Sequence, residues 1–211
     1  MQLFITGIDT DAGKTYATAW LASQLSAQGR RVITQKFIQT GCTGSSEDID
    51  AHRRLTGTGP LPEDAEGLTA PIILSYPASA QLAARIDGVE IDLGVIDRAR
   101  EELARRYDDV LIEGAGGLMV PITDDFMAID YAVTRRLPVA LVTNSKLGSI
   151  NHTVLSLEAL RTRGVNLAYV LYNEHHMGSG PEIEADTLAF LRRYLSRHWP
   201  STRLLLVPEQ A

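Results

Sequence analysis

The sequence predicts a doubly wound α/β fold, a single domain with a mainly parallel sheet and helices on both of its faces. Short apolar runs alternate with amphipathic segments along the chain. Most of these runs are continuously apolar, as expected for strands buried on both faces of a parallel sheet. Polar, glycine-bearing segments follow the runs, where such sheets bind ligands at the carboxyl ends of their strands. This order of strands and helices requires right-handed crossovers between parallel strands.

Hydrophobic periodicity assigns each element in turn. The predicted strands are 2–6, 31–37, 109–113, 138–143, 166–171 and 203–207. The predicted helices are 15–28, 48–55, 79–86, 93–106, 126–136, 149–163 and 181–197. Gly29, Gly57 and Gly164 stand where three of these helices end, a position that favours a left-handed residue. Residues 57–78, which contain several Pro and Gly residues, are predicted to form a surface connection.

Length and composition favour one globular domain over residues 1–211. A chain of 211 residues can bury roughly 70% of its unfolded surface around one core. The net charge is 20 − 26 = −6, and no run of Lys and Arg indicates a nucleic-acid or membrane surface. Asp9 and Asp11 precede any signal-peptide core, and Cys42 has no second cysteine to pair with. We therefore expect a cytoplasmic protein that binds neither nucleic acid nor membranes.

A phosphate-binding loop is predicted between the first strand and the first helix. Polyphosphate requires inward-pointing backbone N–H groups, a cation for the β- and γ-phosphates and a hydroxyl for Mg²⁺. Gly13, Lys14 and Thr15 provide these features, although five residues rather than four separate Gly7 from Gly13. A glycine turn with a solvated lysine is the alternative. The position between a strand and a helix favours the phosphate loop, and with it a P-loop NTPase fold.

Acidic residues near this loop are candidate Mg²⁺ ligands. Glu113 ends a buried strand and precedes a glycine-rich turn, so that it can hold Mg²⁺ beside the phosphates or, alternatively, cap the turn. Asp50 is the second candidate. Glu47 and Asp48 could do the same work, and position alone does not choose among them.

Lys36 ends the second predicted strand, among apolar residues. Lysine is almost never fully buried without a partner, so its side chain either reaches into the site or extends to solvent at the edge of the sheet. Phosphoryl transfer requires positive charge on the migrating group. This requirement favours a catalytic role for Lys36 over an extension of its side chain to solvent.

These motifs, in this order and spacing, resemble the dethiobiotin synthetase family over residues 2–173. The stretch 146–153 is the most specific, because we know no other P-loop family in which Lys-Leu-Gly-Ser precedes Ile-Asn-His-Thr at this place. The matching segments are 6–15, 36–41, Asp50-Ala51, 83–85, 91–92, 113–117, Pro121 and 146–153.

The resemblance implies a homodimer that converts 7,8-diaminononanoate, carbon dioxide and MgATP into dethiobiotin, ADP and phosphate, a step of biotin biosynthesis. In that mechanism one amine of the diamine becomes a carbamate, which attacks the γ-phosphate. The second amine then closes the ring as phosphate leaves. The implied cofactor is Mg²⁺, with ATP as co-substrate.

The resemblance also implies roles for individual residues. Lys14 and Lys36 would stabilise the transferring phosphoryl group, and Thr10 would contact the substrate. The implied Mg²⁺ ligands are Thr15, Asp50 and Glu113. The implied nucleotide-binding residues are Asp11, Ala12, Gly13, Lys14, Thr15, Tyr16, Asp50, Glu113, Gly114, Ala115, Gly116, Asn173 and Pro208. The implied substrate-binding residues are Thr40, Gly117, Leu147, Gly148, Ser149 and Asn151.

Two of these assignments concern the ends of the substrates. The family's substrate carboxylate lies at the N-terminus of the helix that begins near Ser149, on the other subunit, where helix-start amides suit an anion. Asn173 would contact the edge of the adenine.

The chain departs from the family in three places. Phe37 replaces the proline that follows the lysine, which bears on how Lys36 is aimed. Ala80 and Gln81 stand where many members have Pro-His. The sequence ends at Ala211, where members continue into a base-contacting loop. We therefore expect weak discrimination between nucleoside triphosphates, which equal turnover of ATP, GTP and CTP would support and strict use of ATP would contradict.

Two alternative functions remain. An ATP-dependent amide ligase of the cobyrinate type usually carries a glutaminase domain, for which 211 residues leave no room. A non-catalytic nucleotide switch would not need Lys36 together with Thr40.

Two other features are interpreted against further functions. Partition-type ATPases carry a second lysine at the place of Asp9, so that class is disfavoured. His175 and His176 have no third metal ligand at a supporting spacing and are interpreted as loop residues.

Overall fold

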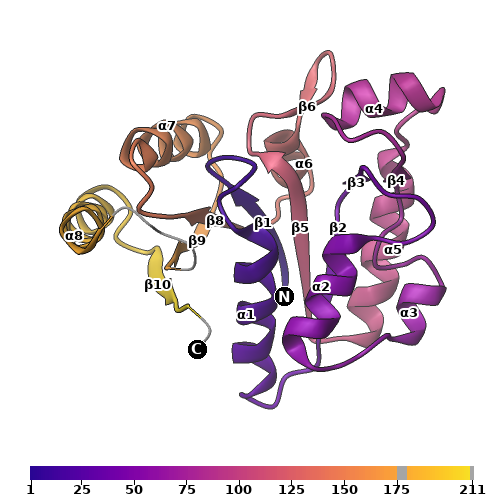
Figure 1. Cartoon of the computed structure of the whole chain (residues 1–211), viewed down its shortest axis with the longest axis horizontal. Helices are drawn as coiled ribbons and strands as arrows, with labels where there is room; N and C mark the ends of the chain where they lie inside the picture. The colour runs from indigo at the N-terminus through magenta and orange to yellow at the C-terminus, as the bar shows by residue number, and fades with distance from the viewer. Residues whose placement is uncertain (175–179, 210–211) are drawn as a thin grey trace.

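A central six-stranded sheet organises the computed structural model, which describes residues 1–174 and 180–209. Its strand order is β10-β9-β8-β1-β5-β2, and every neighbouring pair is parallel, which confirms the predicted fold class (Figure 1). The strands are β1 (Gln2–Gly7), β2 (Val32–Lys36), β5 (Asp109–Gly117), β8 (Val139–Thr143), β9 (Leu167–Asn173) and β10 (Arg203–Val207). His175 and His176 lie outside the described residues.

The predicted helices are present with small shifts at their ends. They are α1 (Lys14–Ser26), α2 (Glu47–Thr56), α4 (Ala80–Asp87), α5 (Leu93–Arg106), α6 (Ala128–Thr134), α7 (Ser149–Thr162) and α8 (Pro181–His198). The helix predicted at 126–136 begins too early. Its first residues form strand β7 (Phe126–Met127), which pairs antiparallel with β6 (Pro121–Thr123). None of the helices among the described residues is long and apolar enough to cross a membrane.

The segment 57–78 is more structured than a surface connection, so that prediction is corrected. It contains the short helix α3 (Pro62–Ala65) and strand β4 (Ile73–Leu74), which pairs with β3 (Gln39–Thr40). Thr69 is buried, and its carbonyl accepts a hydrogen bond from the backbone N–H of Lys36 at 2.7 Å. These elements are too short to show a hydrophobic period, and contacts with β2 and β3 stabilise them.

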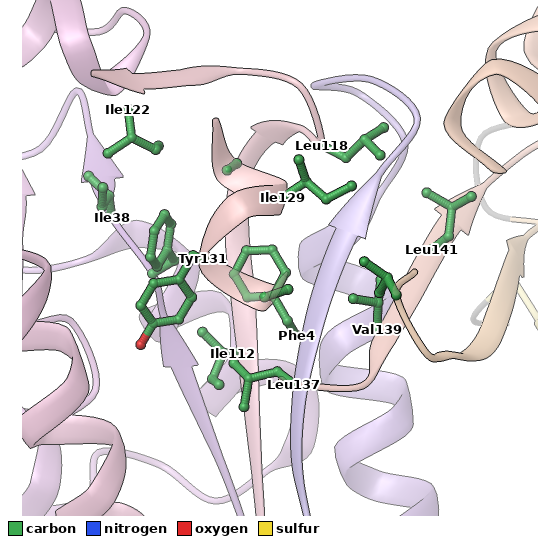
Figure 2. Close-up of a cluster of buried hydrophobic side chains, with 14 of the residues drawn as sticks. Phe4, Ile38, Ile112, Leu118, Ile122, Ile129, Tyr131, Leu137, Val139 and Leu141 are labelled. Atoms are coloured by element: carbon green, nitrogen blue, oxygen red, sulfur yellow. The ribbon is translucent and has the colours of Figure 1, made fainter. Parts of the chain in front are cut away.

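The core has two parts because side chains alternate between the faces of each strand. Leu3 and Ile5 of β1 pack with apolar residues of α1. Phe4 points to the opposite face and belongs to a larger cluster that includes residues of α5, α6 and α7. Figure 2 shows Phe4 and Ile112 facing Tyr131 of α6. The sheet is therefore covered on both faces.

The carboxyl edge of the sheet brings distant segments together. Lys36 at the end of β2 is the register partner of Glu113 in β5, and Glu113 is also the partner of Ile5 in β1. The loop between β1 and α1 leaves the sheet at this same edge (Figure 1). Strand register thus places the predicted lysine and acid next to the predicted phosphate loop.

Candidate active site

The loop between β1 and α1 requires glycine at its last position. Gly13 has a φ of 85°, in the left-handed region that disfavours other residues. A Cβ atom there would lie 1.9 Å from Nδ2 of Asn173. The same Nδ2 donates a hydrogen bond to the carbonyl oxygen of Ala12 at 3.3 Å. Asn173 at the end of β9 therefore packs directly on the loop, and it was predicted from the sequence to contact the nucleotide.

Lys14 opens α1 and is buried. Its Nζ donates hydrogen bonds to the backbone carbonyls of Asp9 at 3.1 Å and Thr10 at 3.0 Å. The pKa of Lys14 is lowered to about 8, mainly by burial; Glu113 opposes this shift, and the positive charge of Lys36 adds to it. The ammonium group thus lies within the curve of the loop, where a polyphosphate would be bound.

A second buried lysine lies beside the first. The Nζ atom of Lys36 is 2.8 Å from Oε1 of Glu113 and 2.5 Å from Oδ2 of Asp48. Burial alone would lower the pKa of Lys36, but the charges of Glu113 and Asp48 outweigh burial and raise it. Burial alone would raise the pKa of Glu113, but Lys36 and His52 outweigh burial and hold it far below its usual range. The site therefore contains a charged lysine and a charged glutamate.

Asp48, not Asp50, is the aspartate at this site, which corrects the choice made from the sequence. Oγ1 of Thr15 lies 3.0 Å from Oδ1 of Asp48 and 3.1 Å from Oε1 of Glu113. Asp50 is exposed. Positions two apart in a helix are separated by roughly 200° around its axis, so only one of the two can face the site. The Ser46 cap, whose Oγ accepts a hydrogen bond from Ile49 N at 3.2 Å, sets the start of α2 and hence which residue faces inward.

His52 completes the site and was not predicted. It is fully buried, and its Nε2 lies 2.7 Å from Oε2 of Glu113. The available sequence signal was its spacing: His52 follows Asp48 by four residues, so both lie on one face of α2.

Three oxygen-bearing side chains could hold Mg²⁺ here: Thr15, Asp48 and Glu113. Mg²⁺ prefers oxygen ligands and usually combines one or two carboxylates with substrate phosphates and water. Among residues 1–174 and 180–209, no group of three or more His, Cys, Asp or Glu side chains is arranged to hold a metal.

The glycine-rich turn after the acid lies within β5 and its end. Gly114 accepts a hydrogen bond from Nζ of Lys36 at 3.3 Å through its carbonyl oxygen, and Ala115 follows it in the strand. Gly116 has a φ of 64°, and a Cβ atom there would lie 2.8 Å from Val120. Glycine at position 116 therefore allows the backbone to take this conformation and to pass close to Val120.

A pocket of about 340 Å³ adjoins the phosphate loop. Its walls come from residues 8–10 of the loop, residues 117–120 after β5 and the side of α7 at His152, Leu155 and Ser156. The pocket contains the predicted substrate contacts Thr10 and Gly117. Thr40, at the end of β3, is not among the residues that line it.

The remaining predicted residues lie at two nearby places. Leu147, Gly148 and Ser149 line a neighbouring pocket of about 320 Å³ at the start of α7, and Asn151 is exposed on the first turn of that helix. At the other end of the loop Asp11 is exposed. The hydroxyl of Tyr16 donates a hydrogen bond to the carbonyl of Pro208 at 2.8 Å, which joins α1 to the segment after β10.

Comparison with known proteins identifies the family. A family model described as an AAA domain matches residues 1–210. The ATP-dependent dethiobiotin synthetase BioD 2 of Pasteurella multocida is 47% identical over 203 residues, which cover 94% of this chain and 93% of the relative. The protein of the same name from Haemophilus ducreyi is 44% identical over 208 residues, which cover 99% of this chain and 98% of the relative. The chain belongs to the dethiobiotin synthetase family. The resemblance and the ATP-dependent ligase class expected from the sequence are confirmed.

Solved structures support the fold alone. A plasmid partition protein of Borrelia burgdorferi bound to AMPPNP has a TM-score of 0.59 at 13% identity, covering 100% of this chain and 86% of that one. The cell division protein FtsY of Thermotoga maritima has a TM-score of 0.58 at 15% identity, covering 100% of this chain and 62% of that one. At such low identities these similarities support the predicted α/β fold and nothing beyond it.

The structure accommodates the departures from the dethiobiotin synthetase pattern. Phe37 is fully buried, with its ring 5.5 Å from that of Phe4 and 4.7 Å from that of Tyr131. This aromatic contact anchors the end of β2 while Lys36 points to the acids. Gln81 of α4 donates a hydrogen bond to the side chain of Asp124.

Proposed function

We propose that this chain, acting as one domain over residues 1–211, closes the ureido ring of dethiobiotin from 7,8-diaminononanoate and carbon dioxide at the expense of ATP. Family membership supports this activity. The observation that carries it in the structure is the set of buried Lys14, Lys36 and Glu113 with the partly buried Asp48, beside an apolar pocket. Phosphoryl transfer needs charged groups that stabilise the phosphates, and an aliphatic substrate needs an apolar pocket to hold it.

The two lysines suit charge stabilisation. The raised pKa of Lys36 keeps its ammonium protonated at neutral pH, so this group is a poor base. Lys14, with a pKa of about 8, is mostly protonated at pH 7. Two fixed cations would stabilise negative charge on the migrating phosphoryl group, which is the main requirement of this reaction.

Thr15, Asp48 and Glu113 are the proposed Mg²⁺ ligands. A bound Mg²⁺ would neutralise charge on the β- and γ-phosphates. Asp48 replaces Asp50 in this proposal because it alone of the two lies near Thr15. Asn173, Tyr16 and the segment at Pro208 lie at the other end of the loop and are proposed to contact the nucleotide.

The pocket beside the loop suits an aliphatic diamine. Leu118, Met119 and Leu155 provide apolar walls for a hydrocarbon chain, while Asp9 and Thr10 provide polar groups at the end nearest the phosphates. A substrate held in this way would present its amine-derived carbamate toward the γ-phosphate. In the proposed homodimer, the start of α7 on the partner subunit would receive the far carboxylate of the substrate.

The α7 side of the molecule supports the dimer. Leu147 is 85% exposed and Leu155 is 61% exposed, and both flank the proposed substrate site. Exposed apolar side chains that cluster around a site favour burial against a partner. A second copy would cover them and complete the site.

Phosphate release from MgATP and bicarbonate, with and without 7,8-diaminononanoate, tests this function. We expect release that depends on the diamine in the wild type and falls by roughly 100-fold or more in Lys36→Ala, because a transition-state cation is lost. Formation of dethiobiotin by mass spectrometry identifies the product. Phosphate release that does not depend on the diamine, or no release, would instead favour a nucleotide switch or another substrate.

A further inference from the structure

His52 lies behind the proposed metal site and has no part in the mechanism above. Glu113 divides its two oxygens between different neighbours. Oε1 lies near Thr15 and Lys36, on the side of the phosphate loop, whereas Oε2 lies 2.7 Å from Nε2 of His52. Both the imidazole and the carboxylate are fully buried.

The hydrogen bond defines the tautomer of His52. Glu113 is ionised and can only accept, so the proton lies on Nε2 of His52. The Nδ1 atom is buried and has no hydrogen-bond partner among the described residues. His52 therefore donates this hydrogen bond to Glu113 at the carboxylate oxygen that does not contact Thr15 or Lys36.

Helix α2 holds this imidazole in place. His52 lies one turn after Asp48, so a single helix face presents an acid to Thr15 and a donor to Glu113. The next residue, Arg53, anchors the helix by bonding Thr34 of β2 at 3.0 Å. The helix thus places the His52 ring within hydrogen-bond distance of Glu113.

We propose that His52 is a positioning residue that aims one oxygen of Glu113 at Mg²⁺-bound nucleotide. A glutamate side chain rotates readily about its last bond, and the hydrogen bond from His52 holds Oε2 on the side away from Thr15 and Lys36, so that Oε1 faces the phosphate loop. Partners of this kind typically change metal affinity by roughly 10- to 100-fold when they are removed. The inference rests on the proposed function, because it assumes that Glu113 serves a metal that arrives with ATP.

Two amide variants separate positioning from simple packing. In His52→Gln the amide nitrogen reaches about as far as Nε2 and can donate to Glu113. In His52→Asn the amide is too short, although it is equally polar. Arg54→Gln changes an exposed residue of the same helix and is the matched control.

The readout is the affinity for a non-hydrolysable ATP analogue, measured by calorimetry with excess Mg²⁺ and again with EDTA. We expect His52→Asn to lose roughly 10-fold or more of its affinity with Mg²⁺ while its affinity in EDTA stays at the wild-type value. His52→Gln and Arg54→Gln should remain within about 3-fold of the wild type in both conditions. If His52→Asn does not fold, His52→Leu, which leaves no unmatched polar group on the ring side, is measured in the same way.

The outcomes distinguish this inference from the proposed function. A wild type whose affinity does not rise with Mg²⁺ would overturn the metal assignment itself. A wild type that responds to Mg²⁺ while the Asn or Leu variant responds equally would overturn only the role of His52. Equal losses with and without Mg²⁺, or no rescue by Gln, would make His52 a packing residue and would also reject the inference.

Discussion

At the scale of single residues, the site is a balanced set of three buried charges and one partly exposed charge, that of Asp48. Lys14 and Lys36 lie within reach of Asp48 and Glu113, so each charge that folding removes from water has an opposite neighbour. Breaking a buried pair by removing one partner is strongly unfavourable, because it leaves the other charge uncompensated. Variants in this set are therefore best chosen to keep the shape of the side chain.

Asp48→Asn tests the corrected aspartate. The amide keeps the size of the side chain but removes the charge that pairs with Lys36 and is proposed to serve Mg²⁺. We expect diamine-dependent phosphate release to fall by roughly 100-fold and the Mg²⁺ concentration for half-maximal rate to rise. Asp50→Asn, on the exposed side of the same helix, should stay within about 3-fold of the wild type. The reverse ranking would restore Asp50 as the ligand.

At the scale of elements, short irregular segments hold the site in register. The Arg53 side chain of α2 bonds Asp64 of α3 at 3.0 and 2.7 Å, and Asp64 also accepts hydrogen bonds from Leu61 and Thr69. The carbonyl of Thr69 in turn bonds the backbone of Lys36. The segment 57–78 therefore links α2 to the end of β2, the two elements that carry the acid and the lysine.

Asp64→Asn should reveal this link as a pH-dependent loss of stability. Burial alone would raise the pKa of Asp64, but hydrogen bonds from Arg53, Leu61 and Thr69 outweigh burial and lower it from 3.8. A carboxylate with a lowered pKa stabilises the folded state above its unfolded pKa, and this contribution is lost as pH falls through the folded value.

We expect Asp64→Asn to lower the free energy of unfolding by about 2 kcal/mol at pH 7, and by progressively less below pH 4. Urea denaturation at pH 7 and pH 3 measures both values. Asp125→Asn, at an exposed position, should change stability by less than about 0.5 kcal/mol at either pH. A loss that is the same at both pH values would show that the charge of Asp64 is not responsible.

Gly116→Ala tests the turn after β5. Gly116 and Gly29 both have positive φ, but only Gly116 has a neighbour, Val120, within 2.8 Å of an added Cβ. We expect Gly29→Ala to lower the free energy of unfolding by about 1 kcal/mol through backbone strain. Gly116→Ala should cost about 1 kcal/mol more because of the clash. Equal losses in urea denaturation would mean that Val120 moves aside freely.

At the scale of the whole molecule, strand order decides where the site forms. From β1 the chain proceeds to β2 on one side of the sheet, and later to β8, β9 and β10 on the other (Figure 1). The strand order thus reverses direction next to β1, and such a reversal opens a crevice at the carboxyl ends of the strands. The phosphate loop lies at this reversal, with the pocket against α7 next to it.

Leu155→Asp tests the proposed dimer. A charge on this exposed apolar position of α7 should oppose burial against a second copy. We expect the wild type to sediment as a dimer and the variant as a monomer with diamine-dependent phosphate release reduced by roughly 10-fold or more. Val89→Asp, at an exposed apolar position after α4, should remain dimeric and active. A monomeric wild type with full activity would contradict the proposal.

The sequence by itself determined the doubly wound sheet, the position of the loop between β1 and α1, and the placement of Lys36 and Glu113 at the ends of two predicted strands; the strand order that makes them neighbours came from the structure. These features are local: continuous apolar runs mark buried strands, and Gly13-Lys14-Thr15 between a strand and a helix identifies the loop without knowledge of distant contacts. Two residues that end parallel strands meet at one edge of the sheet, so their placement follows from the fold class.

Only the tertiary structure decided between Asp48 and Asp50, placed His52 behind Glu113, and paired β3 with β4 and β6 with β7. The rotational setting of α2 depends on the Ser46 cap and on packing against distant strands, and a helix turned by a fraction of a turn would present another acid. The short strand pairs have no hydrophobic period of their own. The pairing of β3 with β4 joins residues more than thirty positions apart, and such a contact cannot be read from neighbouring residues in the sequence.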